Sequence, residues 1–531
     1  MKKVKSICFF LLILISGTSC MLFAKDTESK IEDKTFNESD FEVMNALQFT
    51  KVMGNGINLG NTMGVIMNKL KLNNWKNLDF GNPISGNVFC ADPTAVEFEG
   101  RLYVYGTNDH EQYLTTEKNT YEKIKSFVCF STEDMVNWTY HGQINTGKIA
   151  PWIMNSWAPS ICKRVEEDGL THFYLYFSNS GCGVGVITAT SPLGPWTDPL
   201  KKPLINYGMP GLNSPAPFDP GVCIDDNGIG WLAFGGGVVE GHTRDLPGCS
   251  KIIKLGKDMI SIDSDFVDLE APYFFEASEL NFINGTFVYT FNNCWEKRSK
   301  WQDRWGEKSP LCSMAYMTTK TPLDSKSWIY QGHYFKNPGE MGFEYSNNHT
   351  HLEKYKGQWY LFHHTMNLQK NAGSNGGFRS IAVDKIQIDE NDVSIKMAQA
   401  TNKGPDAIGN LNPKNLVTGT CMVTCSDIIY ENEENPKQIA VKSNDDEGWI
   451  YLKNVEFNKT LSNLDIEAKG NGTICFYVDS VSEETCIAKI EIDSIDFVKS
   501  KSELLKSLDG IHNLFILFSK KECCLKNWIL Y

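Results

Sequence analysis

The fold is decided by the stretch Asn284-Gly285-Thr286-Phe287-Val288-Tyr289-Thr290-Phe291, a tight turn at glycine followed by a strand of aromatic and aliphatic residues. Glycine adopts a positive φ in such a turn without steric cost, and aromatic residues favour strands. The same turn-and-strand motif occurs five times, at residues 99–105, 168–177, 227–234, 284–291 and 356–362. The turn glycines Gly100, Gly169, Gly228, Gly285 and Gly357 are 69, 59, 57 and 72 residues apart. Each unit therefore has room for about four short strands, the content of a propeller blade.

A second recurring motif supports this number of blade-like units, because three of them continue into an outer strand and a turn that ends in tryptophan. We expect these residues, Trp138, Trp196 and Trp328, to pack in the core rather than to contact a ligand. Five units over residues 81–400 predict an all-β chain with a five-bladed β-propeller. A two-sheet sandwich is the alternative.

The N-terminus has the pattern of a secretory signal over residues 1–19. Lysines at positions 2, 3 and 5 precede an apolar run at 8–15, and small residues follow. The run is too short to span a bilayer. Cleavage before Cys20 would leave that cysteine N-terminal, so we expect a secreted or cell-surface protein. A lipid anchor on Cys20 is the second option, although Gly17 stands where such signals usually have an aliphatic residue.

Three further segments complete the predicted organisation. Residues 20–80 form an N-terminal segment to which the sequence assigns no role. Residues 401–425 lack hydrophobic periodicity and indicate a linker. Residues 426–531 contain short strands with turns between them, which predict a small β-sandwich.

Composition restricts the class of partner. The 531 residues carry a formal net charge of −13, which disfavours nucleic acid and anionic membrane surfaces. A neutral small molecule or polymer fits better. The 16 cysteines include no Cys-x-x-Cys pair, so we expect buried core thiols rather than a zinc site.

The candidate site residues lie just before the hairpin glycines in the sequence. Asp92 lies eight residues before its glycine, Asp219 nine, Glu276 nine and His349 eight. Because the first strand of each blade lines the central channel, equivalent positions converge at one end of the axis. One Asp-Pro alone would more often be a turn cap, but three acids in matching register predict a shared pocket. Burial and mutual repulsion there would raise a carboxyl pKa, as a general acid requires.

Residues 81 to about 400 resemble glycoside hydrolase family 43. The resemblance is carried by an ordered series of motifs: Ala91-Asp92-Pro93, the stretch 103–109, Trp157-Ala158-Pro159-Ser160, the stretch 191–196, Asp219-Pro220-Gly221-Val222, Phe275-Glu276-Ala277, Asn348-His349 and Arg379-Ser380. It implies a five-bladed propeller that hydrolyses plant cell-wall polysaccharide, arabinoxylan or xylan.

The resemblance also implies the residue roles. Asp92 would be the general base, Glu276 the general acid and Asp219 the residue that tunes the pKa of the acid. Arg379 would contact substrate. Independently of the resemblance, Trp157 could stack on the apolar face of a sugar, as aromatic rings do, or pack in the core. His349 would hold a structural calcium or order the site, with a satisfied core histidine as the alternative. No cofactor is required for the reaction.

An inverting glycosidase needs one carboxylate to activate water and one carboxylic acid to protonate the leaving oxygen, about 6.5 to 9.5 Å apart. Glu279 is the rival acid, but strand alternation predicts that it turns to the opposite face. The motifs do not separate α-L-arabinofuranosidase from β-xylosidase. A propeller that binds polysaccharide without cleaving it is the alternative from another class.

Residues 426–531 resemble carbohydrate-binding module family 6 through the stretches 448–457 and 510–514. The expected loop at 493–508 has no tryptophan where that family presents a sugar-stacking ring. Trp449 and Trp528 are the remaining aromatic candidates, and we expect both to be core residues. The domain would bind sugar weakly or only support the propeller.

Overall fold

The computed structural model describes residues 78–531. The predicted secretory signal at 1–19, Cys20 and nearly all of the segment 20–80 lie outside the described residues. No helix in the described part has the length and apolar character that a bilayer span requires.

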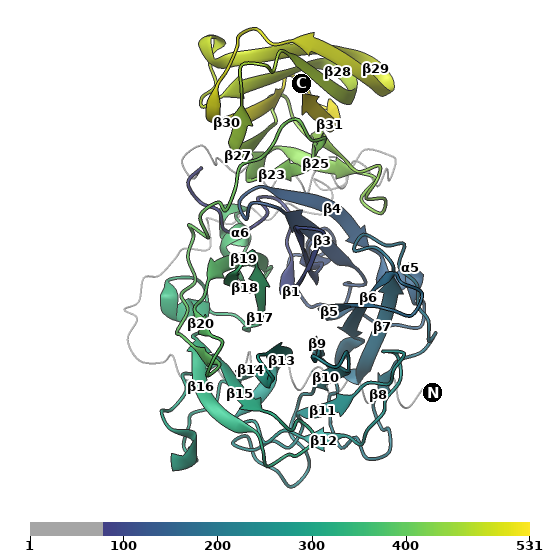
Figure 1. Cartoon of the computed structure of the whole chain (residues 1–531), viewed down its shortest axis with the longest axis vertical. Helices are drawn as coiled ribbons and strands as arrows, with labels where there is room; N and C mark the ends of the chain where they lie inside the picture. The colour runs from purple at the N-terminus through teal and green to yellow at the C-terminus, as the bar shows by residue number, and fades with distance from the viewer. Residues whose placement is uncertain (1–77) are drawn as a thin grey trace, which may run out of the picture. The chain divides into compact units, whose positions relative to one another are not determined.

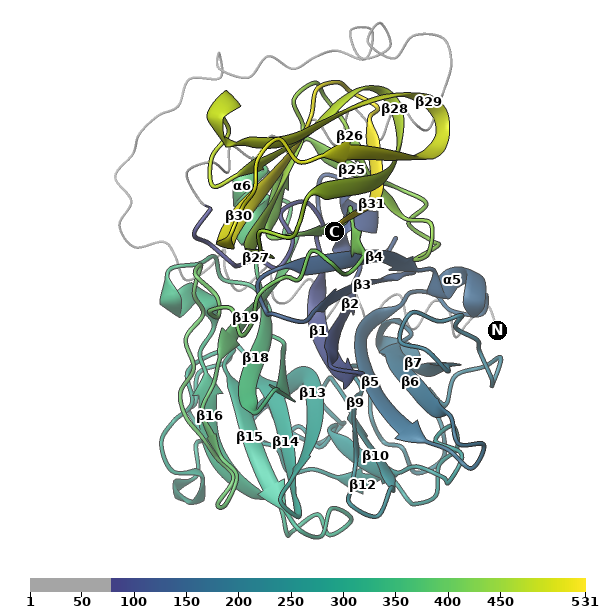
Figure 2. The same cartoon turned by 45° about the horizontal axis from the view of Figure 1, so that its top comes forward.

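Five sheets surround a common centre, which confirms the five-bladed propeller (Figure 1). Four of them contain four or five strands in sequence order from the centre outward, as Figure 2 shows for β13 to β16. Blade 1 comprises β1 (Ala91–Phe98), β2 (Arg101–Thr107), β3 (Phe127–Thr132), β4 (Trp138–Ile144) and β23 (Cys421–Met422). Blade 2 comprises β5 (Trp157–Val165), β6 (Thr171–Ser178), β7 (Gly183–Ala189) and β8 (Ile205–Asn206).

The remaining blades follow the same plan. Blade 3 comprises β9 (Gly221–Ile224), β10 (Gly230–Phe234), β11 (Lys251–Lys254) and β12 (Val267–Asp268). Blade 4 comprises β13 (Phe274–Ile283), β14 (Thr286–Asn293), β15 (Met314–Thr319) and β16 (Ile329–Phe335). Blade 5 comprises β17 (Thr350–Tyr355), β18 (Gln358–Thr365) and β19 (Ser380–Lys385), and a small hairpin of β20 (Ile388–Asp389) and β21 (Ser394–Ile395) follows it. Each predicted turn glycine joins the first two strands of its blade.

The three-stranded blade 5 is completed by the residues that precede blade 1. Ile84 N donates to Ile381 O and Cys90 N donates to Arg379 O, each at 2.9 Å. The Asn82 side chain adds a reciprocal pair of bonds to the backbone of Val383. The segment 81–90 therefore lies along β19 and closes the ring between the last blade and the first.

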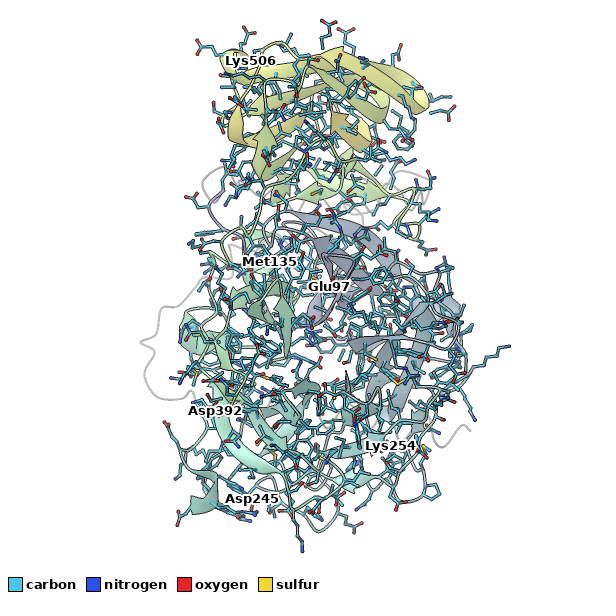
Figure 3. The ribbon with its side chains drawn as sticks, in the orientation of Figure 1. Glu97, Met135, Asp245, Lys254, Asp392 and Lys506 are labelled. Carbon is cyan, nitrogen blue, oxygen red and sulfur yellow. The ribbon has the colours of Figure 1, made fainter. Side chains whose placement is uncertain are left out.

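Aromatic side chains fill the space within and between blades. The predicted core tryptophans Trp138, Trp196 and Trp328 are all buried. Thirteen of the fourteen cysteines in the described part are also buried, as expected for core thiols. Figure 3 labels Glu97 of the inner strand β1, Lys254 at the end of β11, and Asp392 in the turn between β20 and β21.

The C-terminal domain is all-β, and its strands join into one nearly closed nine-stranded sheet around an apolar core. Its strands are β22 (Val417–Thr418), β24 (Thr424–Ser426), β25 (Ile428–Glu431), β26 (Ala440–Ser443), β27 (Trp449–Phe457), β28 (Asn463–Val478), β29 (Cys486–Glu503), β30 (Gly510–Phe518) and β31 (Cys524–Leu530). Within residues 401–425, the short strand β23 pairs with β4 of blade 1 and β22 pairs with β31.

The prediction of a loop at 493–508 is wrong over most of that range. Residues up to Glu503 continue β29, because its pairing with β28 extends to Asn463 opposite Glu503. Trp449 and Trp528 are buried core residues, as predicted.

Candidate active site

The structure brings the three predicted acids together at one end of the channel. Asp92 and Glu276 lie at the starts of β1 and β13, and Asp219 comes two residues before β9. Inner strands of a propeller run in the same direction, so their starts share one mouth. The charge of Asp92 acts on both other acids, and that of Asp219 acts on Glu276. His349 joins them, with Nδ1 at 3.6 Å from Oδ1 of Asp92.

A repeated backbone irregularity turns these side chains toward the mouth. Asp92, Ala158, Asp219 and Ala277 all have a left-handed φ, between 40° and 60°. Register shifts occur at the same points of β1, β5 and β13. Non-glycine residues avoid this region unless their surroundings hold them there, and such strain is concentrated at functional sites.

Each irregular position is held by the neighbouring blade. Ala158 N donates to Thr107 Oγ1 at 2.8 Å, and Asp219 N donates to Ser178 Oγ at 2.7 Å. Asp92 N donates to His364 Nδ1 at 3.2 Å. In these three cases the donor is on one blade and the acceptor is near the end of the second strand of the blade before it, so ring closure fixes Asp92 and Asp219.

Asp92 is built to stay ionised. Its side chain is nearly fully buried, which by itself opposes charge. The Arg379 guanidinium donates from Nη1 to Oδ1 at 2.8 Å, and Thr107 Oγ1 donates to Oδ2 at 2.8 Å. These contacts outweigh burial and lower the pKa of Asp92 below the ordinary aspartate value.

Glu276 is built to stay protonated. Burial raises the pKa of Glu276 well above the ordinary glutamate value, and the nearby charges of Asp219 and Asp92 raise it further. Burial and the charge of Asp92 also raise the pKa of Asp219. Asp219 is held in place because Ala277 N donates to its Oδ2 at 3.0 Å. The site thus lowers the pKa of Asp92 and raises that of Glu276, the separation that acid–base catalysis by two carboxyl groups needs.

Arg379 lies beneath the site and is only 2% exposed. Besides its bond to Asp92, it donates from Nε and Nη2 to Asp109 at 2.9 and 2.8 Å. Asp109 and Thr107 fall within the stretch 103–109, but the sequence predicts no role for either, and for His364 it predicts only packing or a polar contact. Asp109 and Arg379 are 270 residues apart, so no local pattern indicates their pairing.

Trp157 lies at the mouth and is partly exposed. Its Nε1 donates to the backbone oxygen of Tyr121 at 3.1 Å, and the two rings are 6.1 Å apart in an edge-to-face arrangement. One part of the ring therefore packs against the protein and another part remains open to a ligand.

The residues around His349 do not fit a calcium ion. Calcium takes six to eight oxygen ligands. The acidic neighbour of His349 is Asp92, whose oxygens are already bonded to Arg379 and Thr107. Within residues 78–531, no group of three or more His, Cys, Asp or Glu residues is placed to share a metal ion. Burial lowers the pKa of His349 to about 4, so it is a neutral polar group beside Asp92.

Glu279, the rival acid, lies deeper in the channel. Its carboxylate is 3.2 Å from Nδ1 of His351 in blade 5 and accepts from Ser160 Oγ of blade 2 at 3.4 Å. The prediction that it turns to the opposite face is wrong, because the irregularity between Glu276 and Glu279 interrupts strand alternation. Burial opposes the positive charge of His351, but the neighbouring Glu279 outweighs burial and raises the pKa of His351 to about 10. Glu279 is therefore engaged in an ion pair.

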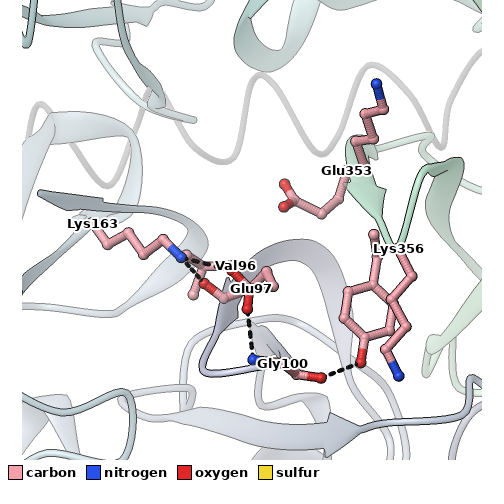
Figure 4. A pocket seen from close by; sticks show the side chains of 8 residues that line it. Val96, Glu97, Gly100, Lys163, Glu353 and Lys356 are labelled. Carbon is pink, nitrogen blue, oxygen red and sulfur yellow. Dashed lines mark hydrogen bonds and ion pairs between the residues drawn. The ribbon is translucent and has the colours of Figure 1, made fainter.

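A polar cavity of about 420 Å³ lies at the opposite ends of the inner strands. Figure 4 shows Lys163 and the Gly100 amide bonded to Glu97. Gly100 O also accepts from the Tyr355 hydroxyl at 2.6 Å. None of the predicted catalytic residues lines this cavity.

Comparison with known proteins gives a consistent result. The model of glycosyl hydrolases family 43 matches residues 80–394. An arabinoxylan arabinofuranohydrolase from Bacillus subtilis (strain 168) is 32% identical over 474 residues, which cover 84% of this chain and 90% of that protein. An arabinoxylan arabinofuranohydrolase from Paenibacillus polymyxa is 29% identical over 466 residues, covering 82% of this chain and 72% of that protein.

A crystal structure agrees with this. It is that of a family 43 arabinoxylan arabinofuranohydrolase from Bacillus subtilis in complex with cellotetraose, and it is similar with a TM-score of 0.78 at 29% identity. The match covers 86% of this chain and 98% of that chain, so it includes the C-terminal domain. Together with the match of the family model over more than half of the sequence, this shows that the chain belongs to glycosyl hydrolase family 43.

Proposed function

We propose that this protein is an α-L-arabinofuranosidase that removes arabinose side chains from arabinoxylan. The observation that carries the proposal is the likeness to arabinoxylan arabinofuranohydrolases, which extends through the propeller and the C-terminal domain. The negative charge of the chain suits a neutral polysaccharide better than a nucleic acid.

The proposed reaction is a single displacement with inversion. Asp92 takes a proton from water while the water oxygen attacks the anomeric carbon of arabinose. Glu276 gives its proton to the departing xylan oxygen, so the bond to xylan breaks as the bond to water forms. The ionised Asp92 and protonated Glu276 described above support these roles, and Asp219 keeps the proton on Glu276 by repulsion. No step uses a metal ion.

The test compares the products that the enzyme releases. We expect arabinose from arabinoxylan and hydrolysis of 4-nitrophenyl α-L-arabinofuranoside, with much slower release of xylose from xylo-oligosaccharides. Faster release of xylose would favour the β-xylosidase alternative. No release from any of these substrates, with unimpaired binding to arabinoxylan, would favour a propeller that only binds polysaccharide.

Replacing Asp219 with asparagine should move the alkaline limb of the pH profile of kcat/KM to lower pH. Glu276 must be protonated to act, and the negative charge of Asp219 raises the pKa of Glu276. Removal of that charge lowers this pKa, so activity is lost at a lower pH as the pH rises. A profile measured from pH 4 to 9 checks this, and an unmoved alkaline limb would contradict the modulating role.

We also propose that the C-terminal domain is a module of the carbohydrate-binding family 6 type. Both of its candidate tryptophans are buried, so we assign it a supporting role rather than tight sugar binding. The pairing of β23 with β4 supports this assignment. Residues 1–19 would direct export, giving a secreted protein or one anchored at Cys20.

A further inference from the structure

Tyr121 lies in the loop between α4 (Asp109–Tyr113) and β3, at the same end of the propeller as the three acids. Its backbone is held from several sides. Its oxygen accepts from Trp157 Nε1 and from Asn155 Nδ2, both at 3.1 Å, and its nitrogen donates to Asn119 Oδ1 at 3.3 Å. The residue has a φ of 62°, which costs a tyrosine energy unless such contacts impose it.

The loop is also tied to the segment before β19 that contains Arg379. Asn119 N donates to Gly376 O at 2.8 Å, and Asn119 Nδ2 donates to Asp109 at 2.8 Å. Asp109 in turn binds Arg379. The backbone of Tyr121 is therefore fixed relative to the group that holds Asp92.

The ring of Tyr121 lies against Arg379, the residue that binds Asp92. The guanidinium carbon of Arg379 is 5.0 Å from the ring centroid, a cation–π distance. On another side the ring meets Trp157, edge to face, with centroids 6.1 Å apart. The bonds that fix the residue use its backbone, and the side chain is partly exposed.

The phenol group keeps its proton under working conditions. Burial raises the pKa of Tyr121 to about 12, and the nearby carboxylates of Asp109, Asp92 and Glu276 add to the shift while Arg379 opposes it. A protonated phenol whose ring lies over the guanidinium that binds Asp92 is a hydrogen-bond donor and acceptor next to the place where a sugar must sit.

We propose that Tyr121 contacts the substrate, with its hydroxyl bonded to the sugar that is held between Asp92 and Glu276. The inference rests on the proposed function and adds a residue that helps to choose the sugar. A site built to bond a substrate hydroxyl group discriminates against sugars that do not present that group in the right position.

The experiment compares Tyr121→Phe, which keeps the ring over Arg379, with the matched control Tyr113→Phe. Tyr113 is in the preceding helix, and its buried hydroxyl has no hydrogen-bond partner among the described residues. With 4-nitrophenyl α-L-arabinofuranoside, we expect kcat/KM of Tyr121→Phe to fall about tenfold, which corresponds to one hydrogen bond. Inhibition by free arabinose should weaken by a similar factor. Tyr113→Phe should match the wild type in both measurements.

Two further readouts separate substrate contact from an effect through Arg379. The acidic limb of the pH profile and the melting temperature of Tyr121→Phe should both stay unchanged. An unchanged kcat/KM would overturn the proposal, and so would a loss accompanied by a shifted acidic limb, because the residue would then act through Asp92.

Failure of the proposed function would look different. If the wild type hydrolysed no arabinoside, calorimetric binding of arabinose and xylose would take the place of kinetics. Weaker binding by Tyr121→Phe of the sugar that the wild type binds would still support the contact. Equal binding, or no binding of either sugar to the wild type, would overturn it.

Discussion

Asp92→Gly should lower kcat/KM by about 10²- to 10⁴-fold with every substrate, because general base catalysis is typically worth that much. The loss should not depend on the leaving group, since the base acts on water. In a single displacement, a small anion can occupy the space that the missing carboxylate leaves. Azide should therefore restore turnover of an activated aryl arabinoside and give an arabinosyl azide of inverted configuration.

Asp219→Gly is the matched control for this rescue. Asp219 has the same Asp-Pro context and the same left-handed backbone as Asp92. Its carboxylate accepts from Ser178 Oγ and Ala277 N, whereas Arg379 and Thr107 donate to Asp92. The pKa of Asp219 is raised, and that of Asp92 is lowered. Rescue of Asp219→Gly by azide, with Asp92→Gly only shifting the pH profile, would exchange the two roles.

Glu276→Gln should affect substrates according to their leaving groups. Arabinoxylan has a poor leaving group that needs a proton, so its hydrolysis should fall by about 10²- to 10⁴-fold. An aryl arabinoside with an acidic phenol needs little protonation and should lose far less. The alkaline limb of kcat/KM should disappear, because the group whose deprotonation ends activity as the pH rises is gone.

Glu279→Gln is the control for the acid. Its carboxylate is paired with His351 deeper in the channel, so removing its charge should leave the leaving-group dependence of the wild type in place. If Glu276→Gln reduced activity on all substrates equally and Glu279→Gln showed the selective loss, the acid would have to be reassigned to Glu279.

Much of the fold could be predicted from local patterns, because each blade repeats one hairpin with a glycine turn. Asp92, Asp219 and Glu276 each lie eight or nine residues before a turn glycine. Because equivalent positions of the blades meet at one end of the central channel, this spacing predicts that the three acids lie together there. Ring closure by residues 81–90 could not be predicted, because that segment has no strand pattern and its bonds reach residues about 300 positions away.

The supporting residues of the site were harder to predict for the same reason. Arg379 meets Asp109 across 270 residues, and His364 meets the backbone of Asp92 across 272. The wrong orientation of Glu279 came from assuming regular alternation in a strand that the left-handed Ala277 interrupts. Local periodicity contains no information about such interruptions, although the recurrent Pro after positions 92, 158 and 219 marks three of the four places where the backbone turns.

The central claim is that Asp92 and Glu276 carry out one displacement with inversion at the anomeric carbon. Proton nuclear magnetic resonance of the first sugar released from an aryl α-L-arabinofuranoside tests this directly, before the anomers equilibrate. We expect β-L-arabinofuranose to form first and the α anomer to follow by mutarotation. Initial formation of the α anomer would mean retention through two displacements and would contradict the assignment of Asp92 as a base that activates water.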